Sequence, residues 1–240
     1  MGQTSDEWLK LEEVAFSRGR KPVFQNLSLT CSERRIGLLG DNGAGKSTFL
    51  RLLNGLLSPQ QGRLQVVGLN PASDVSEAMR AVGFVFQNPD HQIVFPTVLE
   101  EMSFGFRTRG LTRAESSSRA LEWLDRYGCA HWAELSVDEL SDGQRQKLCI
   151  MSVLALEPSV IALDEPFSSL DLSTRLELAD LLARAPQHLI IASHDLDLLQ
   201  TMERLIWLDQ GRIIADGAPG DVVRLYVESC GRHARRRGMV

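Results

Sequence analysis

The chain has little of what marks a protein that crosses a membrane or is held together by disulfides. The uncharged, apolar-rich run Leu148–Leu156 has nine residues, and no other uncharged run is much longer, whereas a membrane-spanning helix needs about 20. The segment Met1–Lys10 is polar and acidic and has no apolar core of a signal peptide. The four cysteines are scattered, with no C-x-x-C pair. We therefore expect reduced thiols of a cytosolic protein rather than a disulfide or zinc framework.

Basic charge is also scarce. Lys and Arg number 26 against 31 Asp and Glu, which gives a formal net charge of −5. Residues 232–240 hold four arginines and no acid, so the preceding residues carry 22 basic against 31 acidic groups, a net charge of −9. This acidic body excludes an obvious nucleic-acid-coating protein, which needs a broad basic face. For the basic tail 232–240 we expect either a solvated chain end or a contact with anionic lipid headgroups.

Short apolar runs alternate with helical segments along most of the chain, a pattern typical of the buried strands of a parallel sheet. Residues 88–140 differ, because they contain helix-like segments and no convincing strand. We expect one α/β domain over residues 1–231, with a helical subdomain at about 88–140. The predicted strands are Trp8–Val14, Val23–Thr30, Arg35–Leu39, Leu64–Val67, Val82–Phe86, Val160–Leu163, His188–Ala192 and Leu205–Leu208. The predicted helices are Ser47–Leu57, Thr97–Arg107, Arg113–Tyr127, His131–Leu135, Gly143–Leu156, Ser173–Ala185, Leu196–Met202 and Asp221–Val227.

A glycine-rich segment, Gly40–Ser47, follows a predicted strand, opens a predicted helix and matches the pattern G-x-x-x-x-G-K-[ST]. Its glycines allow backbone N–H groups to converge on phosphate oxygens, and the helix adds its positive end. Lys46 supplies a charge for the β- and γ-phosphates, and the Ser47 hydroxyl is placed to bind Mg²⁺. We predict that the chain binds ATP with Mg²⁺. The predicted nucleotide-binding residues here are Gly40, Asp41, Asn42, Gly43, Ala44, Gly45, Lys46, Ser47 and Thr48.

Two adjacent carboxylates, Asp164 and Glu165, end the apolar strand Val160–Leu163. Acids at the end of a buried strand are costly unless they face a cation. Beside a phosphate-binding loop, Asp164 is the natural partner of Mg²⁺. Glu165 is then placed to polarise the attacking water as a general base.

The segment Leu140-Ser-Asp-Gly-Gln144 closely resembles the LSGGQ signature of ATP-binding cassette (ABC) ATPases. The resemblance covers residues 8–227, nearly the whole chain. It implies a P-loop NTPase fold of the ABC ATPase type, with a RecA-like core, an N-terminal antiparallel β subdomain and an α-helical subdomain insertion. The other motifs, in that family's order, are the aromatic Phe16, the Q-loop glutamine Gln87, the D-loop Ser169-Leu170-Asp171 and the switch histidine His194.

This resemblance also implies a head-to-tail pair of identical ATPase subunits, with ATP between the phosphate loop of one and the signature of the other. Ser141, Gly143 and Gln144 would then reach the nucleotide across the dimer. Phe16 would stack on adenine. The catalytic residues implied are Glu165, His194 and Gln87. The Mg²⁺ ligands implied are Ser47, Gln87 and Asp164.

One signature position departs from the family pattern, since Asp142 replaces the usual first glycine. A carboxylate near a γ-phosphate would repel it. We therefore expect the Asp142 side chain to point away from the ligand or to cap the signature helix.

Three classes of ABC protein are compatible with these motifs. A decayed cassette that only binds partners is disfavoured, because Lys46, Asp164, Glu165 and His194 are all present. A non-transport ATPase that acts on DNA or ribosomes usually has a long coiled-coil insertion or two cassettes, and this chain has neither. The ATPase subunit of a membrane transporter is therefore favoured, with its membrane helices supplied by a partner.

The segment Phe86–Ile93 and the following Phe95–Phe106 resemble the energy-coupling factor (ECF) importers of vitamins and metal ions. In that group this segment grips a transmembrane coupling subunit, which works with a substrate-binding membrane subunit. The implied location is peripheral, on the cytoplasmic face of the inner (cell) membrane. Asp90 is a candidate partner for an arginine of the coupling subunit.

Within this group, the segments Gln87–Thr97 and Ser141–Ile150 most resemble the ATPases of biotin transporters. The ATPases of cobalt and nickel importers are the alternative, and they usually run longer at the C-terminus. The resemblance therefore implies ATP-driven uptake of a vitamin, with biotin as the expected substrate.

Overall fold

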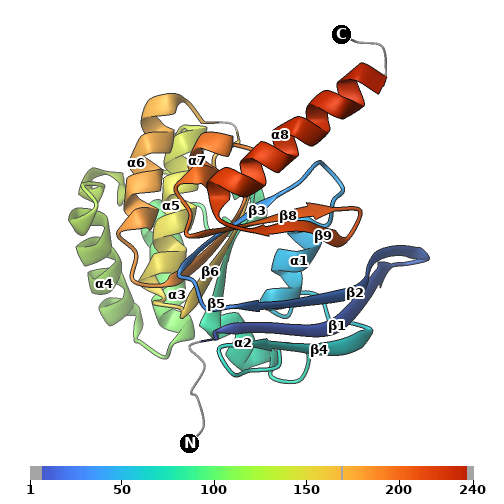
Figure 1. Cartoon of the computed structure of the whole chain (residues 1–240). Coiled ribbons are helices and arrows are strands. Elements are labelled where there is room, and N and C mark those ends of the chain that lie inside the picture. Colours follow the sequence, from blue (N-terminus) through green and yellow to red (C-terminus); the bar gives the residue numbers. More distant parts are fainter. Residues whose placement is uncertain (1–6, 169, 237–240) are drawn as a thin grey trace, which may run out of the picture.

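The described residues form two β-sheets (Figure 1). In this computed structural model, residues 7–168 and 170–236 are described, with side chains as far as residue 232. An antiparallel sheet has the order β2-β1-β4, and a second sheet has the order β5-β6-β7-β3-β8-β9, parallel except for β9. The strands are β1 (Leu9–Arg18), β2 (Lys21–Cys31), β3 (Arg35–Leu39), β4 (Gln61–Val66), β5 (Val82–Val85), β6 (Val160–Asp164), β7 (His188–Ala192), β8 (Arg204–Asp209) and β9 (Arg212–Gly217).

Helices cover the larger sheet and build a separate helical part beside it (Figure 1). The α-helices are α1 (Lys46–Leu53), α2 (Val75–Ala81), α3 (Val98–Thr108), α4 (Arg113–Arg126), α5 (Asp142–Ala155), α6 (Leu172–Ala183), α7 (Leu196–Gln200) and α8 (Pro219–Arg236). Three short 3-10 turns are η1 (Pro89–His91), η2 (Ala130–Trp132) and η3 (Val137–Glu139). Within the described residues, no helix combines the length and the apolar character needed to cross a bilayer.

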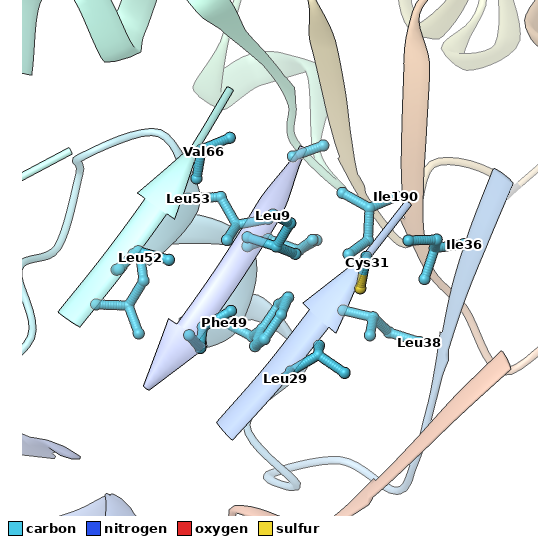
Figure 2. Packing of buried hydrophobic residues seen from close by; sticks show 14 of the residues in the cluster. Leu9, Leu29, Cys31, Ile36, Leu38, Phe49, Leu52, Leu53, Val66 and Ile190 are labelled. Carbon is cyan, nitrogen blue, oxygen red and sulfur yellow. The ribbon is translucent and has the colours of Figure 1, made fainter. Parts of the chain in front are cut away.

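Helix α1 lies between the two sheets, and this position fixes the loop that precedes it. Phe49 and Leu53 are at most 1% exposed and belong to the main apolar core. Figure 2 shows them among Leu9 and Val66 of the antiparallel sheet and Ile36 of the parallel sheet. Because α1 is buried on both sides, the start of the helix is held rigidly at the carboxyl end of β3.

The helical part has its own apolar core. Met102 of α3, Leu124 of α4 and Trp132 of η2 pack with Leu148 and Met151 of α5. Residues 88–140 contain no strand element, as the sequence predicts, apart from an isolated bridge between Thr97 and Ser136. The helical core nevertheless extends past residue 140, because one face of α5 belongs to it while Ile150 and Leu154 pack on the parallel sheet. Helix α5 therefore joins the helical part to the parallel sheet.

Several elements differ from the sequence prediction, among them the predicted helix His131–Leu135, where the structure has only the 3-10 turn η2. Helix α2 and strand β9 were not predicted. Strand β9 alternates intermediate and exposed residues at the sheet edge, so it has no continuous apolar run to reveal it. The C-terminal helix α8 continues to Arg236, past the predicted end at Val227 and past the predicted tail boundary at residue 232. Of that tail, residues 237–240 lie outside the described residues.

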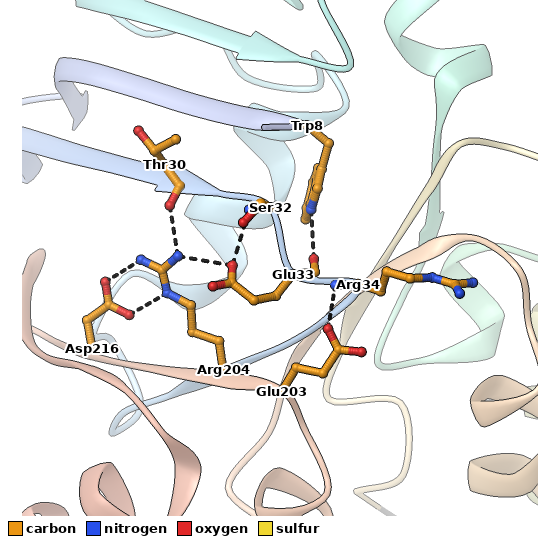
Figure 3. Close-up of polar contacts among 8 residues, drawn as sticks. All are labelled: Trp8, Thr30, Ser32, Glu33, Arg34, Glu203, Arg204 and Asp216. Atoms are coloured by element: carbon orange, nitrogen blue, oxygen red, sulfur yellow. Dashed lines mark hydrogen bonds and ion pairs between the residues drawn. The ribbon is translucent and has the colours of Figure 1, made fainter. Parts of the chain in front are cut away.

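Arg204 of β8 joins the parallel sheet to the N-terminal sheet (Figure 3). Its guanidinium donates two hydrogen bonds of 2.7 Å to Asp216, one of 3.1 Å to Glu33 and one of 2.9 Å to the carbonyl oxygen of Thr30. The Arg204 side chain is 19% exposed. Hydrogen bonds to Asp216 and Glu33 raise the pKa of Arg204 above its ordinary value. The network therefore fixes the antiparallel sheet against β8 and β9.

We expect Arg204→Met to lower the free energy of unfolding by about 2 kcal/mol, because it leaves two partly buried carboxylates without their cation. Chemical denaturation measures this loss. The matched control is Arg119→Met, which removes an ion pair of 3.3 Å between side chains that are 61% and 59% exposed. The control should change stability by less than about 0.5 kcal/mol. Equal effects of the two substitutions would contradict the assigned role of Arg204.

Candidate active site

The glycine-rich loop Gly40–Ser47 connects β3 to α1 at the carboxyl end of the parallel sheet. Gly40 has φ 152°, and a Cβ atom there would lie 2.2 Å from the carbonyl oxygen of Leu208. Gly45 caps α1 with φ 112°, and its Cβ atom would lie 2.9 Å from the Phe24 ring. Only glycine fits these two positions, because both the backbone angle and the space exclude a side chain. The loop thus presents backbone N–H groups and the start of α1, a geometry suited to bind phosphate.

Lys46 lies at the centre of the site. Its side chain is 7% exposed, and its Nζ atom donates a hydrogen bond of 2.5 Å to the carbonyl oxygen of Gly40. The same atom lies 3.5 Å from Oε1 of Glu165. On the other side of Glu165, Oε2 is 2.8 Å from Nδ1 of His194, whose side chain is 70% exposed. The structure thus brings three predicted site residues into one chain of contacts, from buried lysine to exposed histidine.

Asp164 and Ser47 form a second pair next to this chain of contacts. The Ser47 hydroxyl donates a hydrogen bond of 2.8 Å to Oδ1 of Asp164. Burial raises the pKa of the Asp164 carboxyl above its ordinary value. A cation would offset that desolvation cost, because it favours the charged carboxylate. One hydroxyl and one carboxylate fit Mg²⁺, which usually takes one or two protein oxygens together with phosphate oxygens.

Glu165 has a strained backbone. Its φ is 49°, in the left-handed region that residues other than glycine rarely adopt. Its N–H donates a 2.9 Å hydrogen bond to the carbonyl oxygen of Ala192 in β7. Strain of this kind costs about 1–3 kcal/mol and is common at functional sites. The bend directs the carboxylate at Lys46 and His194, and no sequence pattern revealed it.

The signature segment opens helix α5 with a reciprocal cap. The Ser141 side chain accepts a hydrogen bond from the Gln144 N–H, and the Gln144 side chain accepts one from the Ser141 N–H. A Cβ atom on Gly143 would lie 2.7 Å from Cγ2 of Thr174, so glycine allows α5 to approach α6 closely. Within the described part of the chain, no hydrogen bond or ion pair joins Ser141–Gln144 to Gly40–Ser47.

Asp142 does not cap α5, because Ser141 has that role. The Asp142 carboxylate instead accepts a hydrogen bond from Arg145, one turn along the helix, and its side chain is 70% exposed. Of the two alternatives in the sequence analysis, capping by Asp142 is therefore wrong. Arg145 also contacts Asp90, with Nη1 and Oδ1 3.4 Å apart. Asp90 thus has a partner within its own chain, which the sequence analysis did not predict.

Gln87 follows β5 and donates a 3.3 Å hydrogen bond to the Ser168 hydroxyl. This contact places it beside the D-loop, of which Ser169 lies outside the described residues. Gln92, which the analysis did not assign to the site, accepts a hydrogen bond from the Phe86 N–H and donates one to the carbonyl oxygen of Cys149. Gln92 thereby ties the η1 segment to α5 and to the residue that follows β5.

Phe16 occupies a different environment from the one expected for adenine stacking. The residue is only 8% exposed and belongs to the main apolar core, opposite Phe24 in the antiparallel sheet. This is the position of a core residue. A ring in this position has little free surface to offer an adenine. Stacking of Phe16 on adenine therefore stays a prediction.

Tyr226 of α8 reaches the glycine-rich loop. Its hydroxyl donates a 2.8 Å hydrogen bond to Oδ1 of Asp41, which lies 185 residues away in the chain. Its ring meets Trp207 edge-on, with the ring centroids 5.4 Å apart. Burial, with help from Asp41, raises the pKa of the Tyr226 hydroxyl. The C-terminal helix therefore holds an acidic loop residue in place beside the phosphate-binding N–H groups.

We expect Tyr226→Phe to raise the KM for ATP roughly fivefold and to leave kcat within about twofold, because a freed Asp41 carboxylate repels the phosphates. Steady-state ATPase assays separate the two constants. Adding Asp41→Asn to this variant removes the charge, so the KM should return close to its original value. An unchanged KM in Tyr226→Phe would contradict the link between α8 and the loop.

A buried lysine in a glycine-rich loop, a hydroxyl–carboxylate pair and a glutamate directly after that carboxylate together define a P-loop nucleoside triphosphatase. The ABC transporter family model matches residues 24–168, which include the loop, the signature segment and Glu165. The chain belongs to the ABC transporter family, as an ATP-binding subunit that hydrolyses ATP.

Similar proteins agree with this assignment. The chain is 44% identical over 227 residues to the biotin transport ATP-binding protein BioM of Rhodobacter capsulatus, which covers 95% of this chain and 97% of that protein. Its fold matches that of cbiO1 from Clostridium perfringens, part of the ABC transporter complex cbiONQ, with a TM-score of 0.81, 29% identity and coverage of 97% and 96% of the two chains. It also matches the ATP-binding cassette MJ0796, a dimer in a post-hydrolysis state bound to ADP and Pi, with a TM-score of 0.76, 26% identity and coverage of 88% and 98%.

Proposed function

We propose that this chain is the ATPase subunit of an energy-coupling factor importer and that the imported substrate is biotin. The observation that carries the proposal is the similarity to a protein named for biotin transport, which extends over almost the full length of both chains. The structural likeness to cbiO1, part of a transporter complex, supports an assembly of the same general kind. Biotin itself would contact other subunits.

The chemistry follows from the contacts around Lys46. The N–H groups of Gly40–Ser47 and the Lys46 ammonium bind the phosphates of ATP. Ser47 and Asp164 would hold Mg²⁺, with Gln87 as the further ligand that the family resemblance implies, and the ion would neutralise charge on the phosphate oxygens. Glu165 orients the attacking water and takes its proton. His194, 2.8 Å from Glu165, is placed to hold that carboxylate and to contact the γ-phosphate.

We further propose that two copies of the chain pair head to tail around ATP. Ser141 and Gly143 are at the start of α5, where backbone N–H groups and the positive end of the helix favour a phosphate. No described contact joins them to the phosphate loop of their own chain. A second copy would bring its signature to this loop, and ATP would then hold the two copies together. Hydrolysis of the ATP would release the pair.

The segment around η1 is the proposed contact with the transmembrane coupling subunit. Val94, next to η1, is 73% exposed. Asp90 is 62% exposed although it also pairs with Arg145. The single guanidinium of Arg145 pairs with the carboxylates of both Asp90 and Asp142, so a net negative charge remains. A cation of the membrane partner would pair with this acidic site. This contact would keep the chain at the cytoplasmic face of the membrane.

The test is purification of the native membrane complex through a tag on this chain, followed by mass spectrometry of its subunits and its bound small molecule. We expect an equimolar transmembrane partner and biotin. Recovery of a complex loaded with cobalt or nickel would contradict biotin as the substrate but would still support an importer. A tagged chain that purifies from membranes without integral membrane partners would contradict the importer.

A further inference from the structure

Arg145 stands between two acidic residues from different parts of the chain. It lies in the first turn of α5, and its side chain is 25% exposed. One Nη atom donates to Asp142 in the signature, and the other lies 3.4 Å from Asp90 in η1. Hydrogen bonding to Asp142 and the charges of Asp90 and Asp138 raise the pKa of Arg145. The guanidinium thus links the Asp142 carboxylate to Asp90 in η1.

Asp142 needs such a partner because of where it stands. The start of a helix attracts any anion, a side-chain carboxylate as well as a phosphate. The cap of α5 is already complete through Ser141 and Gln144, so the cap does not hold the Asp142 side chain. A free carboxylate here would compete with a phosphate for the same N–H groups and would repel it. The usual glycine at this position carries no such charge.

We propose that Arg145 is a positioning residue for ATP binding, which turns the Asp142 carboxylate away from the γ-phosphate bound by the signature of this chain. The proposal rests on the head-to-tail pairing proposed above. In this role, Arg145 allows an aspartate to occupy a signature position without weakening ATP binding. The role is electrostatic, so it depends on Asp142 and should vanish when Asp142 loses its charge.

The test uses full-length chain carrying Glu165→Gln, and it measures the ATP concentration that gives half-maximal dimer in size-exclusion chromatography. We expect Arg145→Ala to raise this concentration roughly tenfold, the scale of one unshielded charge at a few ångströms. Adding Asp142→Asn to Arg145→Ala should bring it back to within about twofold of the starting value. Arg145→Lys keeps a cation, so its half-maximal ATP concentration should lie between that of the starting chain and that of Arg145→Ala.

Asp90→Ala is the control for the other ion pair of Arg145, and it should leave the half-maximal concentration within about twofold. Circular dichroism of each variant checks that α5 is intact. The proposal is overturned if Arg145→Ala has no effect, or if the double variant stays as weak as Arg145→Ala, which would mark a structural role. A lack of any ATP-dependent dimer in the Glu165→Gln chain alone would overturn the head-to-tail pairing, and the role of Arg145 with it.

Discussion

Lys46→Ala is expected to weaken ATP binding by roughly 100-fold or more, because it removes the buried cation that faces the phosphates. The Lys46 side chain is 7% exposed and already bonds to the carbonyl oxygen of Gly40, so it is fixed in place before the nucleotide arrives. Isothermal titration with ATP and Mg²⁺ measures the loss. Binding of ATP by the variant within about threefold of the original affinity would contradict the role of the loop.

The same substitution has a second consequence, which provides its control. Glu165 lies 3.5 Å from Lys46 and is 11% exposed, so it would remain buried without its cation. We therefore expect Lys46→Ala to destabilise the fold by about 3 kcal/mol. Adding Glu165→Gln should restore much of this stability, whereas ATP binding should stay lost. Thermal unfolding of the two variants thus separates a binding defect from a folding defect.

Glu165→Gln is expected to lower ATP turnover by roughly 100- to 10,000-fold, the range for loss of a general base. Glutamine has the same shape and adopts the same backbone, so the strained φ of 49° is kept. ATP affinity should not fall, because the amide removes a negative charge near the phosphates. Phosphate-release assays and titration with ATP give the two quantities separately.

The chain offers a matched control for this substitution. Glu157 has a φ of 45° and is also a glutamate in the left-handed region, but it is exposed and lies in the turn before β6. Glu157→Gln should leave turnover within about twofold of the unmodified chain. Turnover above a tenth of normal in Glu165→Gln would show that another group takes the proton from water.

Local motifs in the sequence predicted most of the candidate site. The strand–glycine loop–helix pattern placed Lys46 and Ser47 correctly at the carboxyl end of a parallel strand. Asp164, the last residue of β6, contacts Ser47, and the next residue, Glu165, contacts Lys46. Such patterns succeed because the chemistry and the backbone geometry depend on the same few consecutive residues. The helical part was also predictable, because its apolar residues recur with helical spacing.

Contacts between distant segments were not predictable in this way. The hydrogen bond from Tyr226 to Asp41 and the ion pair between Arg145 and Asp90 depend on how α8 and η1 pack, and neither residue pair has a pattern of its own. Burial of Phe16 depends on α1 covering the antiparallel sheet. The positive φ of Glu165 is a property of the folded site alone. These four features required the structure.

The most direct test of the account is a mixing experiment with two inactive variants. In a head-to-tail pair, each site takes its phosphate loop from one copy and its signature from the other. Lys46→Ala disables the loop. Ser141→Asp keeps the helix cap but places a carboxylate where the γ-phosphate would bind, and Ser141→Asn is its uncharged control.

Each variant alone should show almost no ATP turnover. A mixture of equal amounts should recover up to roughly a quarter of normal turnover, because half of randomly formed pairs are mixed and each mixed pair has one intact site of two. The measurement is phosphate release against the fraction of each variant, which should peak at equal amounts. A mixture as inactive as its two components at every ratio would contradict a site shared between two copies of this chain.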